Sequence, residues 1–122
     1  MHKINYLLFS LPFPLSDIQW RVGSTTFDKK KAQMLGYIDS RQVMERLDKV
    51  VGNFYWETDI RKEGDTYLCS LKVNGCTKTD GAGATNVEGE KGGVSDAIKR
   101  AAVQFGIGRY LYELGNVWVP QK

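Results

Sequence analysis

The sequence predicts an α+β fold, an antiparallel β-sheet made of a hairpin plus a three-stranded meander and packed on helices. Two strand-like runs within residues 19–38 flank the polar loop FDKKK, a pattern typical of a hairpin. Three further strand-like segments follow, and Asn74-Gly75 between the last two is a strong two-residue turn signal. Helical patterns precede and follow that meander. The predicted order is ββ-α-βββ-α.

Length and composition favour one small globular domain spanning residues 1–122, with 42% hydrophobic and 25% charged residues. A net charge of +3 permits nucleic-acid binding without requiring it. The single histidine, His2, makes histidine-based triads and His-rich metal sites improbable. Cys69 and Cys76 are too few for a disulfide framework, and we expect buried free thiols in a reducing compartment.

Residues 1–18 look like an N-terminal arm that packs on the domain or on a neighbouring copy. The arm is too apolar to remain in water, and Pro12 and Pro14 prevent a long helix. Its apolar run, Tyr6–Leu15, is too short to span a bilayer and has no clear signal-peptide cleavage site. We therefore expect a soluble, cytoplasmic protein with no membrane partner.

A first helix is predicted from Asp39 to Gly52. Asp39 is the expected N-cap, and Gln42 completes a capping box. The apolar positions fall at helical spacing: Val43, Met44, Leu47, Val50 and Val51. The solvent-facing side is expected to carry Arg41, Glu45, Arg46, Asp48 and Lys49.

The meander is predicted over Phe54–Arg61, Thr66–Val73 and Cys76 to about Gly81. Residues 81–93 (GAGATNVEGEKGG) are glycine-rich and are expected to form a flexible linker. This stretch lacks the third glycine of a dinucleotide fingerprint, and the chain has no GxxxxGK[ST] sequence. We expect no ATP and no other cofactor.

The last helix, within VSDAIKRAAVQFGIGRYLYEL, organises the rest of the chain. Ser95 is its expected N-cap. One face is predicted to carry Ile98, Ala101, Ala102, Phe105 and Tyr112 and to lie on the sheet. Gly106 and Gly108 indicate a bend, a close backbone contact, or a helix end followed by a short helical turn.

Lys99 and Arg100 lie opposite that alanine face. The ordinary explanation for such a pair is a solvated helix surface. Other basic residues can extend the pair into a phosphate-binding stripe: Lys91, Arg109, Arg21, Lys78 and Arg41. Binding by such a stripe is electrostatic, sensitive to salt and blind to sequence.

Two other functions fit parts of the sequence. The order α-βββ-α from Asp39 onward is that of a monomeric double-stranded-RNA-binding module, although the extra hairpin argues against it. Asp39, Glu57, Asp59 and Asp80 are candidate Mg²⁺ ligands of a nuclease, but their spacing gives no support beyond chance. We therefore expect no enzyme activity.

SDAIKRAAVQFGIGRYLYEL resembles the signature helix of the Rad fifty-two superfamily of single-strand annealing proteins, in particular its bacterial and phage DdrA-like and Sak-like branch. The segments IQWRVGST, GYIDSRQVMERLDKVVG and FYWETDI match the same family in the same order. The resemblance covers about residues 7–119.

The resemblance implies a β-β-β-α core assembled into a homo-oligomeric ring or filament. Single-stranded DNA would lie in a basic groove with its bases free to pair with a complementary strand without ATP. By position, it places DNA-binding roles on Arg21, Lys99 and Arg100, with Lys91 and Tyr37 in support. It implies DNA repair or recombination at the nucleoid of a bacterial or phage-infected cell, with a single-strand DNA-binding protein as a further candidate partner. Val103 departs from a position that is basic in some relatives, which puts a second, outer DNA site in doubt.

Overall fold

Two separate three-stranded antiparallel sheets carry the fold, in a computed structural model that describes residues 4–26, 28–83, 90–114 and 117–120. The first sheet has the order β1-β2-β6 and consists of β1 (Gln19–Thr25), β2 (Lys31–Tyr37) and β6 (Val117–Pro120). The second has the order β3-β4-β5 and consists of β3 (Trp56–Glu63), β4 (Thr66–Val73) and β5 (Cys76–Gly83). The helices are η1 (Tyr6–Ser10), η2 (Leu15–Asp17), α1 (Ser40–Val50), α2 (Glu90–Val103) and α3 (Arg109–Glu113). The predicted α+β class, hairpin and meander are confirmed.

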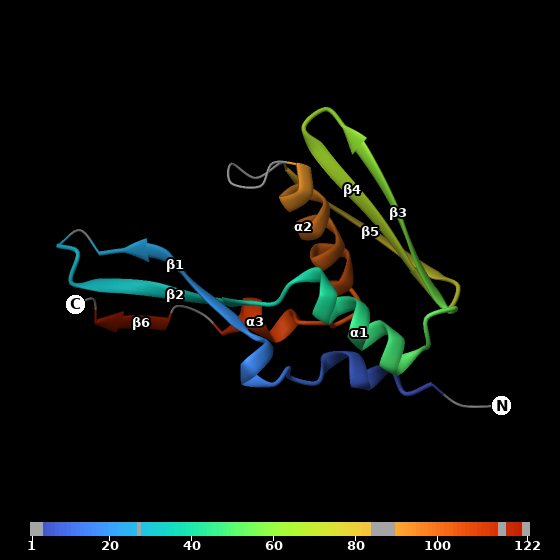
Figure 1. The fold of residues 1–122 in the computed structure, drawn as a ribbon, viewed down its shortest axis with the longest axis horizontal. Helices are drawn as coiled ribbons and strands as arrows, with labels where there is room; N and C mark the ends of the chain where they lie inside the picture. The colour runs from blue at the N-terminus through green and yellow to red at the C-terminus, as the bar shows by residue number, and fades with distance from the viewer. Residues whose placement is uncertain (1–3, 27, 84–89, 115–116, 121–122) are drawn as a thin grey trace.

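The β1–β2 hairpin extends away from the second sheet, and β6 lines its far side (Figure 1). The sequence pattern did not predict β6, because this strand is only four residues long and ends at Pro120. Its pairing with β2 makes β2 the central strand of the sheet. The turn of the second hairpin forms as predicted, with Asn74 and Gly75 both at positive φ.

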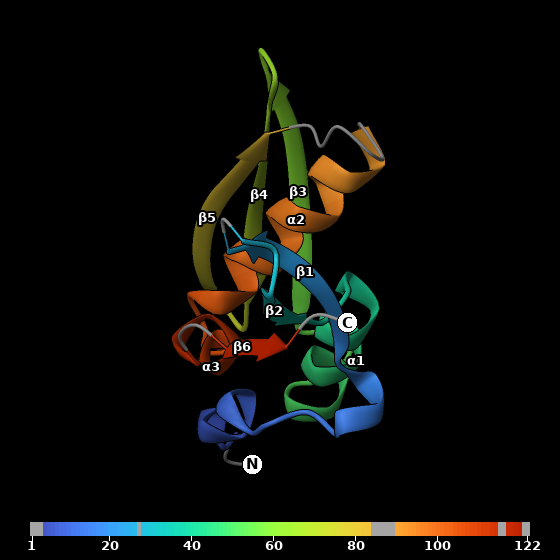
Figure 2. The same ribbon diagram turned by 90° about the vertical axis from the view of Figure 1, so that its left-hand side faces the viewer.

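The second sheet and α2 form the core. In β4 the buried residues alternate with more exposed ones, as Tyr67, Cys69, Leu71 and Val73. Helix α2 crosses this face of the sheet (Figures 1 and 2). Its buried contacts are the small residues Ala97, Ala101 and Ala102, which let the helix backbone approach the strands closely.

Helix α1 begins with the predicted capping box, in which Asp39 N–H donates to Gln42 Oε1 at 2.9 Å. Val43 and Leu47 are its buried residues, and Gly52 follows at positive φ.

The expectation that Arg46 faces solvent is wrong. Its guanidinium turns onto the N-terminal arm, where Nη1 donates to three carbonyls, Leu8 O at 3.2 Å, Phe9 O at 3.0 Å and Leu11 O at 2.7 Å. Partial burial there lowers the pKa of Arg46 from its ordinary value. The arm itself folds into η1 and η2, and Phe9 and Phe13 are buried in the core.

Ser95 does not cap α2, because the helix begins earlier, at Glu90. The segment 81–93 is therefore not a linker throughout, since 81–83 complete β5 and 90–93 open α2, while 84–89 lie outside the described residues. Packing overrides the low helix propensity of Gly92 and Gly93, and Gly93 is buried. Gly81 leaves room in β5 for the Leu68 side chain, since a Cβ there would come within 2.8 Å of Leu68 Cδ2.

Gly106 follows the end of α2, and Gly108 is the N-cap of α3. Ile107 N–H donates to Ala102 O at 3.2 Å and Gly106 N–H to Val103 O at 2.9 Å, which is the Schellman pattern. Gly106 and Gly108 have φ values of 99° and 72°, in the left-handed region. The predicted helix end followed by a short helical turn is confirmed. Because the chain turns here, Tyr112 leaves the buried face on which the helical wheel placed it and is 67% exposed.

Both cysteines are free, but only Cys69 is buried. Cys76 follows the Asn74-Gly75 turn and is exposed, so the expectation of two buried thiols is wrong for Cys76. Burial, with a smaller contribution from Asp59, raises the pKa of the Cys69 thiol to about 11. Across the described part of the chain, no helix has the length and apolar character needed to cross a membrane.

Candidate nucleic-acid interface

Two cations from different elements lie over the ring of Tyr37. Lys99 Nζ of α2 is 5.5 Å from the ring centre, and Arg21 Cζ of β1 is 5.8 Å from it. Both distances are within the range of a cation–π interaction. The ring therefore holds two positive charges together that would otherwise repel each other.

The strand register explains how Arg21 reaches Tyr37. Tyr37 ends β2 and pairs with Gln19, so Arg21, two residues further along β1, is its diagonal neighbour on the same face. Helix α2 reaches the same place from the second sheet. Lys99 is half-buried, with 19% of its side chain exposed, and its Nζ is 3.4 Å from Asp96 Oδ1. Asp96 is itself 42% exposed, so this ion pair is a weak one.

Arg100 is exposed one residue further along α2. The positive charges of Arg100 and Arg21 both act on the Tyr112 hydroxyl of α3 and favour its ionised form. Partial burial of the phenol raises the pKa of Tyr112, the two arginines oppose this rise, and Asp96 and Asp80 add to it. We call Arg21, Tyr37, Lys99 and Arg100 the Tyr37 cluster. Its cations come from β1 and α2, and Arg21 and Arg100 are exposed, whereas Lys99 is half-buried.

Lys78 and Arg109 are used inside the fold. Lys78 Nζ donates to Gln104 O at 3.0 Å and lies 5.1 Å from the centre of the Phe105 ring. Arg109 donates to Val103 O through both Nε, at 3.1 Å, and Nη2, at 2.7 Å. Both side chains therefore bind carbonyls at the C-terminal end of α2, and neither has a described contact with the Tyr37 cluster.

The two remaining predicted site residues are Arg41 and Lys91. Arg41 is exposed in the first turn of α1, and no contact of its side chain with the Tyr37 cluster is described. Lys91 lies in the first turn of α2, but its side chain is outside the described part of the structure.

Sequence reasoning did not place Asp96 and Tyr112 beside the cluster. The spacing of Asp96 and Lys99, three residues apart on a helix, was the available signal for the ion pair. For Tyr112 the signal was the pair of glycines, because a chain reversal there changes which face each later residue takes. The four carboxylates considered as Mg²⁺ ligands belong to no potential metal-binding group of three or more side chains among the residues that the structure describes.

Comparison with protein families matches the half of the chain that carries Lys99 and Arg100. A model of the Rad52/22 family, described as double-strand break repair proteins, matches residues 62–122, which include β4, β5 and α2. Two curated proteins named single-stranded DNA-binding protein DdrA are similar to this chain. The one from Deinococcus deserti is 41% identical over 116 residues, and the one from Deinococcus radiodurans is 38% identical over 112 residues.

Each alignment covers 88% of this chain but only 56% and 54% of the respective relative. The chain thus spans about half the length of the curated relatives that it matches. No solved structure matches it significantly.

Proposed function

The chain belongs to the Rad52/22 family, and on that premise we propose that it binds single-stranded DNA and anneals complementary strands without ATP in DNA repair or recombination. The observation that carries the proposal is the convergence of Lys99 and Arg21 on the ring of Tyr37, with Arg100 beside them. The two relatives named as single-stranded DNA-binding proteins support it.

The chemistry of the Tyr37 cluster suits a phosphate backbone. Lys99, Arg21 and Arg100 supply positive charge that attracts phosphates. Neutralising phosphates releases counterions, so binding should weaken with salt and show little dependence on sequence. A strand held by its backbone keeps its base edges available, which is the state that pairing with a second strand needs.

We further propose that the chain acts as a homo-oligomer, a ring or filament in which clusters of neighbouring copies form one continuous groove. Large apolar side chains left in water support this assembly, since such surfaces mark interaction sites. Phe54 is 93% exposed, Leu15 79% and Leu7 78%. Lys91, Arg41 and a single-strand DNA-binding protein are further candidate contacts of this assembly.

Annealing of two complementary fluorescent oligonucleotides without nucleotide cofactor tests the function. We expect Lys99→Ala/Arg100→Ala to weaken strand binding by tenfold or more at low salt, because about two phosphate contacts are lost, and to slow annealing. Lys49→Ala/Arg61→Ala removes the same charge from exposed positions on α1 and β3 and serves as the matched control. Unchanged binding and annealing by a folded Lys99/Arg100 variant would refute the site.

A further inference from the structure

Three consecutive lysines form the tip of the β1–β2 hairpin. Lys29, Lys30 and Lys31, which we call the lysine tip, are all exposed. Within the described ranges the one ion pair is Lys99–Asp96, so none of the three lysines is neutralised in that way. The nearest acidic residue in sequence is Asp28, and three lysines against one aspartate leave the tip strongly positive.

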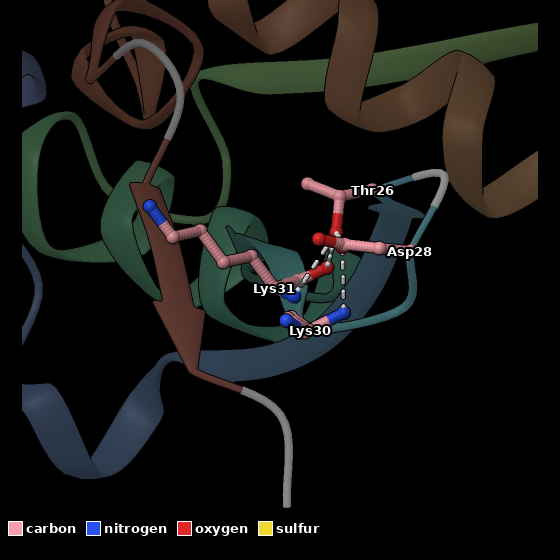
Figure 3. Close-up of a pocket in the computed structure, with 4 residues that line it drawn as sticks. All are labelled: Thr26, Asp28, Lys30 and Lys31. Carbon is pink, nitrogen blue, oxygen red and sulfur yellow. Dashed lines mark hydrogen bonds between the residues drawn. The ribbon is translucent and has the colours of Figure 1, made fainter.

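The Asp28 carboxylate accepts hydrogen bonds from groups within the turn and forms no described ion pair with a lysine ammonium group. Its Oδ1 accepts from Thr26 Oγ1 at 2.7 Å and from Lys30 N–H at 3.0 Å (Figure 3). These hydrogen bonds lower the pKa of Asp28, so the carboxylate stays ionised and keeps its acceptor role. Thr26, Asp28, Lys30 and Lys31 line a hollow that is open to solvent.

Backbone hydrogen bonds fix the same turn. Thr26 N–H donates to Lys31 O at 2.9 Å, and Lys29 N–H donates to Thr26 O at 2.8 Å. Lys29 itself has a positive φ of 61°. The lysines therefore extend from a structured support, which reduces the entropy that a ligand must remove on binding.

Lys31 of the lysine tip lies on the same face of the hairpin as Tyr37. Alternate residues of a strand share a face, so Lys31, Gln33, Leu35 and Tyr37 line the same side of β2. Six residues at about 3.3 Å each separate Lys31 from Tyr37 by roughly 20 Å. Between them, the Leu35 side chain lies across Gly23, where a Cβ would come within 2.7 Å of Leu35 Cδ1.

The opposite face of β2 has a different character. It carries Ala32, Met34 and Gly36, and the Trp20 ring covers Gly36 at 3.1 Å from the position of a Cβ. Ala32 is buried. The hairpin thus separates an apolar face from a face that has cations at both ends.

We propose that the lysine tip is a second phosphate-binding point for the strand held by the Tyr37 cluster, so that one single-stranded DNA follows the hairpin face between them. This inference rests on the proposed function. A DNA strand carries one phosphate per about 3.4 Å of helix axis, so 20 Å corresponds to roughly six phosphates, and to fewer in an extended strand.

The test uses Lys29→Asn/Lys30→Gln/Lys31→Gln, in which asparagine tolerates the left-handed backbone at position 29. The affinity for a labelled thirty-nucleotide strand is measured by fluorescence anisotropy over a series of salt concentrations. Losing three phosphate contacts should reduce the slope of log K against log salt by about 2, at roughly 0.7 per contact. Lys49→Gln/Arg61→Gln/Lys72→Gln removes equal charge from exposed positions on α1, β3 and β4 and should leave the slope unchanged.

Varying the length of the DNA strand distinguishes direct phosphate binding at the lysine tip from long-range electrostatic attraction by the whole protein. The loss of affinity in the lysine-tip variant should be small for a strand of about four nucleotides held at the Tyr37 cluster. It should grow with strand length until the strand spans both binding points. An unchanged slope in the tip variant, or an equal reduction in the control, would overturn the second binding point. If Lys99→Ala/Arg100→Ala still impairs binding in that case, the proposed function stands, whereas a wild-type protein that binds no single strand refutes both.

Discussion

The guanidinium carbon of Arg46 lies 4.0 Å from the centre of the Phe13 ring, and the same guanidinium binds carbonyls of the N-terminal arm. One side chain of α1 thus fixes the arm by a cation–π contact and by charged hydrogen bonds. Arg46 contributes to the stability of the fold and has no described contact with the Tyr37 cluster.

We predict that Arg46→Ala lowers the free energy of unfolding by about 2 kcal/mol or more, because several carbonyls lose a charged donor. Arg46→Lys should recover little, since an ammonium group cannot reproduce the planar fork. Urea denaturation measures both. Arg41→Ala, on the exposed start of the same helix, should change the stability by less than about 0.5 kcal/mol. An equal effect of the two alanine variants would contradict the role given to Arg46.

Asp96→Asn should strengthen binding to single-stranded DNA. The carboxylate lies 3.4 Å from Lys99 Nζ and repels an approaching phosphate. Its removal should raise the affinity about two- to fivefold at low salt, from Coulomb energies of roughly 0.5–1 kcal/mol in water. The free energy of unfolding should change by less than about 1 kcal/mol, because exposed ion pairs are weak. Anisotropy titrations that show weaker binding would mean that Asp96 positions Lys99 productively.

Tyr37→Leu should weaken strand binding about fivefold or more, because the two cations lose the ring that holds them together, at roughly 0.5–1 kcal/mol per contact. Tyr37→Phe keeps the ring face and should bind nearly as the wild type does. The two variants are compared by anisotropy after circular dichroism has established that both fold. A Phe variant as impaired as the Leu variant would assign the effect to the hydroxyl instead.

Native alkylation should distinguish the two thiols. Iodoacetamide at pH 8 should modify the exposed Cys76 and leave Cys69 unmodified, and mass spectrometry should find one adduct in native protein and two in urea. Raising the pH to 9 should not expose Cys69 to reaction, because burial raises the pKa of its thiol to about 11. Rapid double labelling of native protein would contradict the burial of Cys69.

The same shift of the Cys69 pKa has a consequence for stability. The folded-state pKa lies above the ordinary value of 9.0, so the thiol contributes stability below pH 9. That contribution should be lost as the pH rises from 9 to 11, where the unfolded chain releases the proton and the folded chain retains it. Cys69→Ala should remove this pH dependence in urea denaturation, whatever its effect on stability at pH 7.

Local signals predicted most elements of the fold. The capping box from Asp39 to Gln42 and the Asn74-Gly75 turn depend on neighbouring residues only, so they could be recognised in the sequence. The start of α2 could not, because Gly92 and Gly93 favour a loop until packing against the sheet holds them in a helix. β6 was missed for a related reason, since its pairing with β2 is set by distant residues.

The candidate site was predictable in composition but not in arrangement. Basic side chains could be found in the sequence, yet it could not distinguish Lys78 and Arg109, which bind backbone carbonyls, from Lys99 and Arg21, which converge on Tyr37. That difference depends on where β1, β2 and α2 meet in space.

The pairing of β6 with β2 sets an order on folding during synthesis. Met34 pairs with Val117, so this edge of β2 stays without its partner until β6 has been translated. Contacts between distant segments form slowly, and an unpaired strand edge is prone to join another chain. The hairpin that carries Arg21, Tyr37 and the lysine tip is therefore completed only when β6 has formed, and until then its free edge can mispair between nascent copies.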